Sequence, residues 1–539
     1  MSEALAAPAQ AGWRAWRGRP VALGALCTLL FLTFLDNTVV SVALASVQSD
    51  LRAGVSSLQW VVGAYALTFA ALMLGFGMVG DEFGRKKVML AGAGIYCAGA
   101  AVSALAPSIP VLITGRAVMG LGAAASEPGT LSMIRQLYPD ERSRNRALGV
   151  WAAVSGFSLA LGPVLGGALV GLWSWRGIFW FDVTFGLAAL AVAAIVLPES
   201  ADRRTGKVDA VGTLLGAAAL AALVFAIING ETAGFTAPAI VALYCVSALA
   251  AIAFVVWEHR TDHPLLDLRF LRMPRFTVPN LVAFCSYFAT FAVFFFSALY
   301  LAEVAGYSGY RIAAVFTPMA AVMIAASLLA GRLTTAIGVR WSLVAGCLVF
   351  GGGLLATNAV LGPHPYYPAL AVALAVAGAG LGACIVPLTS SVLHAVPGER
   401  SGMAASATNT SREVGAVVGV VVLGALVSSQ LRAGLVSRMS HLHVPGAIQA
   451  YIIGAVETGG GASLAAGGGS GGSGGGLIGQ LYRAGYAAFA SALHDALYLS
   501  AGLLGIVALL AAITLRRTAQ EENQLASRSG DPEASGEIP

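Results

Sequence analysis

The chain has few charged residues. Asp, Glu, Lys and Arg together make up 11% of its 539 residues, whereas soluble domains carry roughly 25%. This deficit excludes a chain built from water-soluble domains. The mean hydropathy of +0.80 and the 58% of hydrophobic residues predict instead that most of the chain crosses a lipid bilayer.

Cysteine is scarce as well, and its positions exclude a disulfide framework or a metal site. The six cysteines have no metal-like spacing, and we expect them to pack as small apolar side chains between helices. All six lie in apolar runs: Cys27, Cys97, Cys245, Cys285, Cys347 and Cys384.

Sequence motifs of catalysis are missing too. The chain has no phosphate-binding loop, no zinc-ligand cluster and no nucleophile elbow. We therefore expect no enzymatic activity, no metal and no cofactor, and we expect any energy source to be an ion gradient rather than ATP.

Long apolar runs dominate what is present, and they predict an all-α membrane protein with fourteen spans. The expected spans are 20–45, 57–79, 88–106, 110–134, 147–171, 176–197, 209–229, 235–257, 277–302, 310–332, 339–362, 367–394, 402–430 and 487–515.

Lysine and arginine predict the orientation of these spans. Seventeen of them fall in one set of loops and five in the other, and the two tails add six to the richer side. Basic residues mark the cytoplasmic side, so we expect both termini in the cytoplasm and the protein in the cell membrane. The five on the outer side are Arg52, Arg311, Arg432, Arg438 and Arg483.

The spans and polar connectors predict two six-helix bundles separated by two extra helices. We expect a cytoplasmic tail over 1–19, a first bundle over 20–197, two extra spans with their connectors over 198–275, a second bundle over 276–515 and a cytoplasmic tail over 516–539. The last outer loop, 431–486, contains a Gly/Ser-rich stretch that predicts a flexible linker, either natural or engineered. The tail from Ala519 is expected to be disordered.

One dense charge cluster interrupts the apolar sequence near its start: Gly77-Met-Val-Gly-Asp81-Glu-Phe-Gly84-Arg85-Lys86-Lys87. Such a cluster cannot lie in hydrocarbon, so it predicts a tight cytoplasmic turn between two helices. It resembles the loop between helices 2 and 3 of major facilitator superfamily transporters. A weaker echo, Gly331-Arg332-Leu-Thr-Thr335-Ala-Ile-Gly338-Val-Arg340, predicts an internal repeat.

Further motifs resemble the fourteen-helix drug:proton antiporter family of that superfamily, in order along nearly the whole chain. The resemblance implies the major facilitator fold and export by proton exchange. The motifs are Leu35-Asp36-Asn37-Thr38, Arg116-Ala-Val-Met-Gly120, Gly156-Phe-Ser-Leu-Ala-Leu-Gly162-Pro163-Val-Leu-Gly166-Gly167, Trp173-Ser-Trp175-Arg176 and Asn409-Thr-Ser-Arg412-Glu413. The family's usual residues differ at Ser41 and Ala45, and at Asp182 where asparagine is usual.

Intramembrane charges are costly, at least about 2.5–3.5 kcal/mol each at mid-bilayer, so they predict the coupling site. Asp36 and Arg116 fall at similar depth in the outer half, which permits an ion pair or a relay. We expect Asp36 to carry the transported proton. We further expect Asp81 to latch the two bundles on the cytoplasmic side, as part of a gate with Gly77, Gly84, Arg85 and Lys86.

A second proton site has two main candidates, and we rank Glu413 above Glu127. Glu413 falls near the midplane on one helix face with Asn409 and Ser406, which we expect to steady its carboxylate. Arg412 could instead neutralise Glu413, although successive helix residues point roughly 100° apart. Glu127 could merely cap the bend at Pro128. Asp182 fits a structural hydrogen bond or proton coupling equally well.

Two further patterns leave alternatives open. The glycines Gly156, Gly162, Gly166 and Gly167 with Pro163 fit a hinge or a static close-packed interface. The aromatic residues Phe284, Phe288, Phe291 and Phe295 share a helix face that could line a ligand site with Asn409, or could face lipid or core.

The function predicted from these patterns is proton-coupled efflux of hydrophobic, including cationic, drugs or antibiotics by alternating access. The alternatives are export of one endogenous lipid or secondary metabolite, and a non-transporting membrane sensor or scaffold. The expected partners are a small hydrophobic substrate, protons and membrane lipids, with no nucleic acid and a monomeric chain.

Overall fold

A computed structural model of the chain describes residues 12–199, 209–261, 264–362, 365–396, 401–441 and 477–515. All regular secondary structure within these ranges is helical. The elements up to the first polar connector are α1 (Gly12–Val39), η1 (Val40–Ala43), α2 (Leu44–Leu51), α3 (Val55–Phe83), α4 (Arg85–Ala104), α5 (Ile109–Leu137), α6 (Glu141–Leu172) and α7 (Arg176–Val196).

The remaining elements comprise a central helix pair and the second half of the chain. The central pair is α8 (Ala210–Ala233) and α9 (Pro238–Arg260). The second half contains η2 (Phe270–Arg272), α10 (Pro274–Phe291), the π-helical turn η3 (Ala292–Ser297), α11 (Ala298–Glu303), α12 (Gly309–Val360), α13 (Tyr367–His394), α14 (Ser401–His441) and α17 (Leu477–Thr514).

The predicted number of spans is confirmed once the longest helix is divided. Thirteen described helices are long and apolar enough to cross a membrane, and α12, with 52 residues, contains a break at Gly338 (φ 81°, ψ 161°). Gly84 has a similar positive φ of 108° between α3 and α4, where a side chain would be strained. The motif Gly331–Arg340, which repeats the first charged loop, therefore turns at Gly338 as the first loop turns at Gly84.

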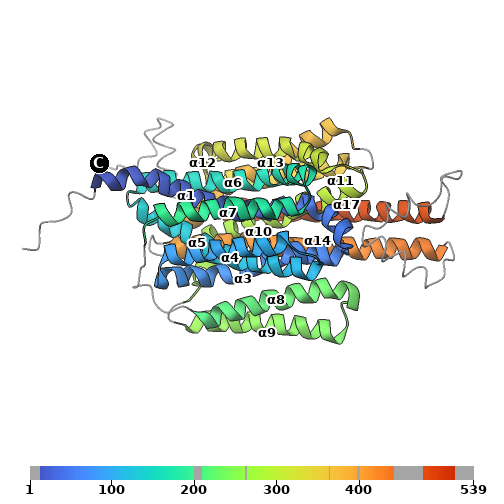
Figure 1. Ribbon diagram of the computed structural model, residues 1–539, viewed down its shortest axis with the longest axis horizontal. Helices are drawn as coiled ribbons and strands as arrows, with labels where there is room; N and C mark the ends of the chain where they lie inside the picture. Colours follow the sequence, from blue (N-terminus) through green and yellow to red (C-terminus); the bar gives the residue numbers. More distant parts are fainter. Residues whose placement is uncertain are drawn as a thin grey trace, which may run out of the picture.

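The helices form two bundles, and Figure 1 shows them running side by side along the long axis of the molecule. The first bundle contains α1 and α3 to α7, and the second contains α10 to α14 with α17. Each half has a consecutive helix pair packed through glycines. A Cβ on Gly92 of α4 would lie 2.7 Å from the carbonyl oxygen of Gly122 of α5, and one on Gly346 of α12 would lie 3.2 Å from that of Gly380 of α13. The paired packing agrees with an internal repeat.

The two extra helices, α8 and α9, lie side by side at the edge of the molecule (Figure 1). The rings of Trp60 on α3 and Phe225 on α8 are 4.5 Å apart, so α8 packs against the first bundle. Asp209 caps α8 by accepting from the backbone N–H of Gly212 at 2.8 Å and joins α9 by accepting from Trp257 Nε1 at 2.9 Å. Most of the surface of the pair stays free of helix contacts, as expected for a lipid-facing addition.

The helices that contain the last two spans are longer than the predicted spans. The predicted outer loop 431–486 is in part helical, because α14 continues to His441 and α17 begins at Leu477. The two helices hold each other through Gln430 Nε2, which donates to Asp495 Oδ2 at 2.7 Å. The Gly/Ser-rich stretch of this loop and the tail from residue 516 lie outside the described residues. The predicted N-terminal tail is already helical from Gly12.

Prolines inside helices leave backbone carbonyls without their usual N–H partner. Pro163 of α6 frees the carbonyl of Leu159, and the Thr38 hydroxyl of α1 donates to that oxygen at 2.8 Å. Neighbouring helices supply the same compensation twice more. Ser391 donates at 3.1 Å to the carbonyl of Arg275, four residues before Pro279. Tyr367 donates at 3.3 Å to the carbonyl of Ala314, four residues before Pro318. These bonds let bent helices persist where no water is available.

Candidate functional site

An ion pair lies inside the first bundle. Nη1 of Arg116 on α5 is 2.6 Å from both carboxylate oxygens of Asp36 on α1, and neither side chain is more than 1% exposed. The contact that their equal depth permits is therefore present, while the proton-coupling role stays a prediction. Removing one partner of a buried pair costs about 3–5 kcal/mol, because the other charge is left alone.

Backbone and aromatic groups hold Arg116 in place. Its Nε donates to the Val61 carbonyl of α3 at 2.9 Å, and its guanidinium carbon lies 4.5 Å from the centre of the Tyr65 ring. The Tyr65 hydroxyl donates to the Thr33 carbonyl at 3.0 Å. The three helices α1, α3 and α5 are thus joined around one cation.

A hydrogen bond next to this pair crosses between the bundles. Nδ2 of Asn37, the residue after Asp36 on α1, donates to Oε1 of Glu413 on α14 at 3.0 Å. Glu413 is 2% exposed, and its Oε2 has no hydrogen-bond partner among the described residues. The predicted midplane carboxylate therefore faces the first bundle.

A second hydrogen bond crosses the same interface in the opposite sense. Nδ2 of Asn409 on α14 donates to Oε1 of Glu127 on α5 at 2.7 Å. Glu127 is 1% exposed, and its Oε2 also has no partner among the described residues. Each bundle thus contributes one carboxylate, which accepts a hydrogen bond from an asparagine of the other bundle.

The predicted support of Glu413 by Asn409 is wrong, because Asn409 turns to Glu127. Ser406 lies near the end of the interface instead, where its Oγ would be 3.6 Å from a Cβ on Gly77 of α3. The four-residue spacing put Asn409 and Glu413 on one helix face, but each reaches a different helix of the first bundle.

Arg412 pairs with neutral groups rather than with Glu413. Its Nη1 donates to Asn409 Oδ1 at 3.1 Å, and its Nη2 donates to the Thr389 hydroxyl of α13 at 2.9 Å. The guanidinium carbon lies 5.7 Å from the centre of the Tyr287 ring. Arg412 therefore does not neutralise Glu413 by direct contact, because the two side chains have different hydrogen-bond partners.

Asp182 lies fully buried on α7 with 0% exposure. Neither carboxylate oxygen makes a hydrogen bond with a described residue. Its charged neighbours are Asp36 and Arg116 of the ion pair.

The glycines of α6 face two different helices. A Cβ on Gly166 would lie 2.5 Å from the Val39 carbonyl oxygen, and Gly162 is in equally close contact with Thr38, so this face packs on α1. A Cβ on Gly167 would lie 2.5 Å from the Gly309 carbonyl oxygen of α12, across the interface. Gly156 also faces α12, at Ser327.

The charged loop lies where α3 meets α4, and the predicted tight turn is present at Gly84. Arg85 and Lys86 begin α4 directly after it. Gly77 brings α3 close to the second bundle, since a Cβ there would lie 3.6 Å from Ser406 Oγ. The Asp81 backbone belongs to α3, but its side chain lies outside the described part of the structure.

The predicted aromatic face is interrupted. Phe284 and Phe288 have ring centres 6.4 Å apart, and their backbones lie against Gly415 and Gly419 of α14. The π-helical turn η3 contains Phe295. Such a turn holds an extra residue, so the regular helical spacing on which the predicted face depends ends before Phe295. All four are mostly or fully buried between helices, and a role in ligand binding stays a prediction.

Some residues of this site were not predicted from the sequence. Asn37 and Thr38 belong to the first-helix motif, and their position next to Asp36 is the one feature of the sequence that could have indicated a role in the site. Thr389 and Tyr287 carry no pattern of their own, and only the packing of α13 and α10 brings them to Arg412.

The geometry gives this interface the means to bind and release protons. Two carboxylates each accept one bond from the opposite bundle, and each keeps one oxygen without a partner among the described residues. Ionised and protonated carboxyl groups differ in the hydrogen bonds they accept or donate, so a proton at either site would alter contacts between the bundles. The buried ion pair beside them supplies a third carboxylate.

Comparison with known proteins matches the chain to one family. The family model described as Major Facilitator Superfamily matches residues 26–420. Multidrug resistance protein Stp of Mycobacterium tuberculosis (strain CDC 1551 / Oshkosh) is 31% identical over 427 residues, which are 79% of each chain. Methylenomycin A resistance protein of Streptomyces coelicolor is 33% identical over 76% of this chain and 86% of its own.

Another relative covers almost the whole chain. Multidrug efflux pump LfrA of Mycolicibacterium smegmatis is 29% identical over 94% of this chain and 97% of its own. Among solved structures, an inward-facing, unoccupied bacterial homologue of the human lysosomal transporter Spinster has a TM-score of 0.63 at 20% identity, covering 92% of this chain and 97% of its own. That likeness concerns the fold.

Proposed function

The chain belongs to the major facilitator superfamily, and we propose that it exports hydrophobic drugs or antibiotics, including cationic ones, in exchange for protons. Relatives that carry drug-efflux and antibiotic-resistance names support the substrate class. The energy comes from the proton gradient, and the chain performs no catalysis.

The reciprocal pair of hydrogen bonds between Asn37 and Glu413 and between Asn409 and Glu127 is the observation that carries the proposal. A transporter that alternates its access must break and remake contacts between its bundles. Here two of those contacts are made by buried titratable groups. Proton binding therefore acts directly on the surface that has to open.

Asp36 is the primary proton carrier in this scheme. In one state Arg116 neutralises its carboxylate, and in the other a proton does so, because a lone charge at either residue would be costly. Glu413 is the second proton site, with Glu127 as its counterpart across the interface. A cationic substrate that enters the space beside Glu413 displaces its proton by charge competition.

Alternating access uses the close glycine contacts. The backbones of α6 and α12 meet at Gly167 and Gly309, and this contact allows the bundles to rock without large side chains to repack. Asp81 latches the cytoplasmic side with Gly77, Gly84, Arg85 and Lys86. Substrate binds between the bundles, against Asn409 and the aromatic residues Phe284, Phe288, Phe291 and Phe295.

The protein acts as a monomer in the cell membrane with both termini in the cytoplasm. The excess of basic residues in the loops on the side of the termini supports this orientation. Its partners are substrate, protons and membrane lipids.

A host strain without its own drug pumps provides the test. Cells that express the protein are loaded with ethidium, a hydrophobic fluorescent cation, and a panel of antibiotics is screened beside it. We expect faster efflux and higher resistance than in cells with the empty vector, and loss of both on addition of a protonophore. Efflux that continues unchanged with the protonophore would contradict proton coupling, and a panel without any exported compound would contradict the drug class.

A further inference from the structure

Three fully buried polar groups near the ion pair lack hydrogen-bond partners among the described residues. They are Nη2 of Arg116, both carboxylate oxygens of Asp182 and the hydroxyl of Tyr96. Their residues are 0%, 0% and 3% exposed. Buried polar groups without partners are uncommon and costly, and three together indicate a site whose partners change.

Helix packing brings these groups to one place. Gly186 of α7 meets α1 and α4, because a Cβ there would lie 3.4 Å from Leu32 and 2.6 Å from Cys97 Sγ. Asp182 is one helical turn before Gly186, and Asp36 is one turn after Leu32. Since α1 and α7 run in opposite directions, both residues lie on the same side of this contact, at similar depth along the two helices.

The charged and titratable groups facing Asp182 come from three helices. They are Asp36 on α1, Arg116 on α5, and Tyr96 with Cys97 on α4. Arg116 binds both oxygens of Asp36 through Nη1 alone, which leaves Nη2 available for a second acceptor. Arg116 is the one cation in this group.

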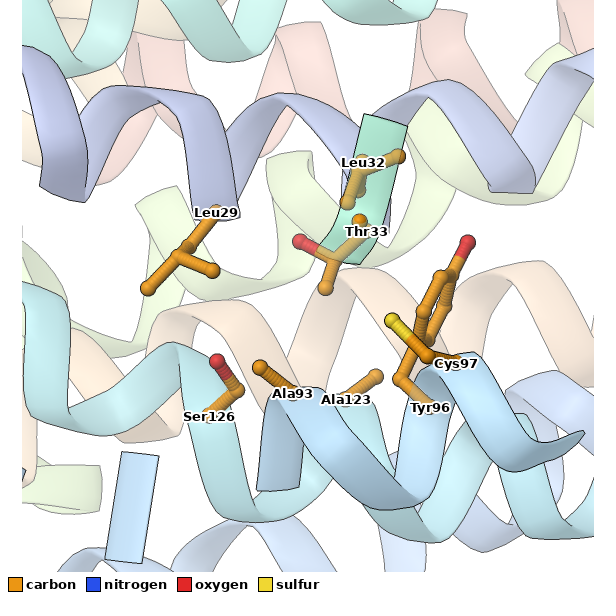
Figure 2. Close-up of a pocket in the computed structure, with 9 residues that line it drawn as sticks. Leu29, Leu32, Thr33, Ala93, Tyr96, Cys97, Ala123 and Ser126 are labelled. Carbon is orange, nitrogen blue, oxygen red and sulfur yellow. The ribbon is translucent and has the colours of Figure 1, made fainter. Parts of the chain in front are cut away.

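Tyr96 and Cys97 are the members of this group that border a small open space. A small cavity between α1, α4, α5 and α7 is lined by Thr33, Tyr96, Cys97, Ser126 and Gly186 among others. Figure 2 shows Thr33 of α1 opposite Tyr96 and Cys97 of α4. The cavity has room for about one water molecule, so a side chain at its edge can reorient without displacing the core.

We propose that Asp182 is an alternate acceptor for Arg116, which turns to it when Asp36 takes a proton. Nη2 of Arg116 then pairs with the Asp182 carboxylate, beside the Tyr96 hydroxyl that is already its neighbour. When the proton leaves Asp36, Arg116 returns to Asp36. Asp182 is thus a positioning residue that keeps the guanidinium paired in both states. The inference deepens the proposed proton coupling and rests on it.

A double-mutant cycle on melting temperature tests the exchange without any transport assay. Asp36→Asn imitates the protonated state and Asp182→Asn removes the alternate acceptor. We expect the double variant to lose several degrees more than the sum of the two single losses, because only there is Arg116 unpaired. Strictly additive losses would overturn the proposal.

A third substitution keeps the cycle informative if the double variant does not fold. Adding Arg116→Met removes the unpaired cation, so it should restore folding and melting temperature in the double variant while lowering both in the wild-type background. Failure of this rescue would overturn the proposal as well.

The pH profile of efflux supplies the readout that a structural role would not move. Without the alternate acceptor, Arg116 stays paired with Asp36 and favours its ionised form. We therefore expect Asp182→Asn to shift half-maximal ethidium efflux to a lower outside pH by about one unit, and Asp182→Glu to restore it. Asp50→Asn, which breaks the outlying pair with Arg176, serves as the matched control. A wild-type profile in Asp182→Asn would contradict the exchange, whereas absence of protonophore-sensitive efflux in the wild type would contradict the proposed function itself.

Discussion

Asn409 and Glu127 are joined across the two bundles by a 2.7 Å hydrogen bond from Nδ2 to Oε1. The same carboxamide also accepts a bond at its Oδ1 from Arg412 at 3.1 Å. Asn409 therefore connects the carboxylate of one bundle to the guanidinium of the other. Asn37 donates to Glu413 at 3.0 Å, but its Oδ1 has no second partner in the part of the chain that the structure describes.

This difference predicts unequal effects of the two asparagines on stability. Asn409→Ala leaves an acceptor and a donor without partners and should lower the free energy of unfolding by about 2 kcal/mol, whereas Asn37→Ala should lower it by about 1 kcal/mol. Thermal unfolding of the purified variants in detergent measures both. Equal losses, or a larger loss for Asn37→Ala, would show that the Asn409 bridge is not the stronger link.

The two interface carboxylates are expected to differ in proton release. When a cationic substrate binds to purified protein, Glu413→Gln should release fewer protons than wild type, because the wild-type Glu413 carboxyl is the group that the substrate charge deprotonates. Glu127→Gln should release nearly as many as wild type. A pH-indicator titration at several pH values makes the comparison, with Asp50→Asn as control. The reverse order would make Glu127 the second proton site.

The hydroxyl of Thr38 is predicted to stabilise the bend at Pro163. Thr38→Val keeps the shape but leaves the Leu159 carbonyl without a donor, which should cost about 1 kcal/mol of unfolding free energy. Thr38→Ser retains the hydroxyl and serves as the control in the same thermal unfolding assay. A stability of Thr38→Val equal to that of wild type would mean that the bond to Leu159 contributes nothing.

The contact between Gly167 and Gly309 is predicted to be necessary for movement between the bundles. In Gly167→Ala the new Cβ would lie 2.5 Å from the Gly309 carbonyl and 2.7 Å from Ala313 Cβ, so α6 and α12 must separate and transport should fall several-fold. Gly149→Ala on the same helix meets nothing within 4 Å and should leave transport unchanged. Ethidium efflux at matched expression compares the two, and normal efflux by Gly167→Ala would exclude a requirement for this close approach.

Hydropathy and charge were sufficient to predict the membrane-spanning helices, and the resemblance of the motifs implied the major facilitator fold. The spans are long apolar runs between charged turns, and the break at Gly338 divides α12 where the repeated loop motif indicates. The contact between Asp36 and Arg116 could also be predicted, because depth along two antiparallel spans follows from residue counts. The continuation of α14 to His441 and the start of α17 at Leu477 could not be predicted, because hydropathy does not mark a helix that extends past its apolar run.

The partners of α14 were beyond the reach of sequence patterns. Helical periodicity puts Asn409 and Glu413 on one face, but it does not state which neighbouring helix each will meet. That depends on how α14 crosses α1 and α5, which the packing of Gly415 and Gly419 against α10 fixes. The π-helical turn at Phe295 was invisible for a similar reason, because it depends on the hydrogen bonds of a packed helix.

The most direct test of proton-coupled export through Asp36 uses proteoliposomes with an imposed pH gradient. Wild-type protein should concentrate ethidium against its gradient, and Asp36→Asn should fail to do so while still exchanging labelled for unlabelled ethidium in the absence of a pH gradient. Concentration of ethidium by Asp36→Asn at the wild-type level would contradict the account, because it would place the driving proton on another group.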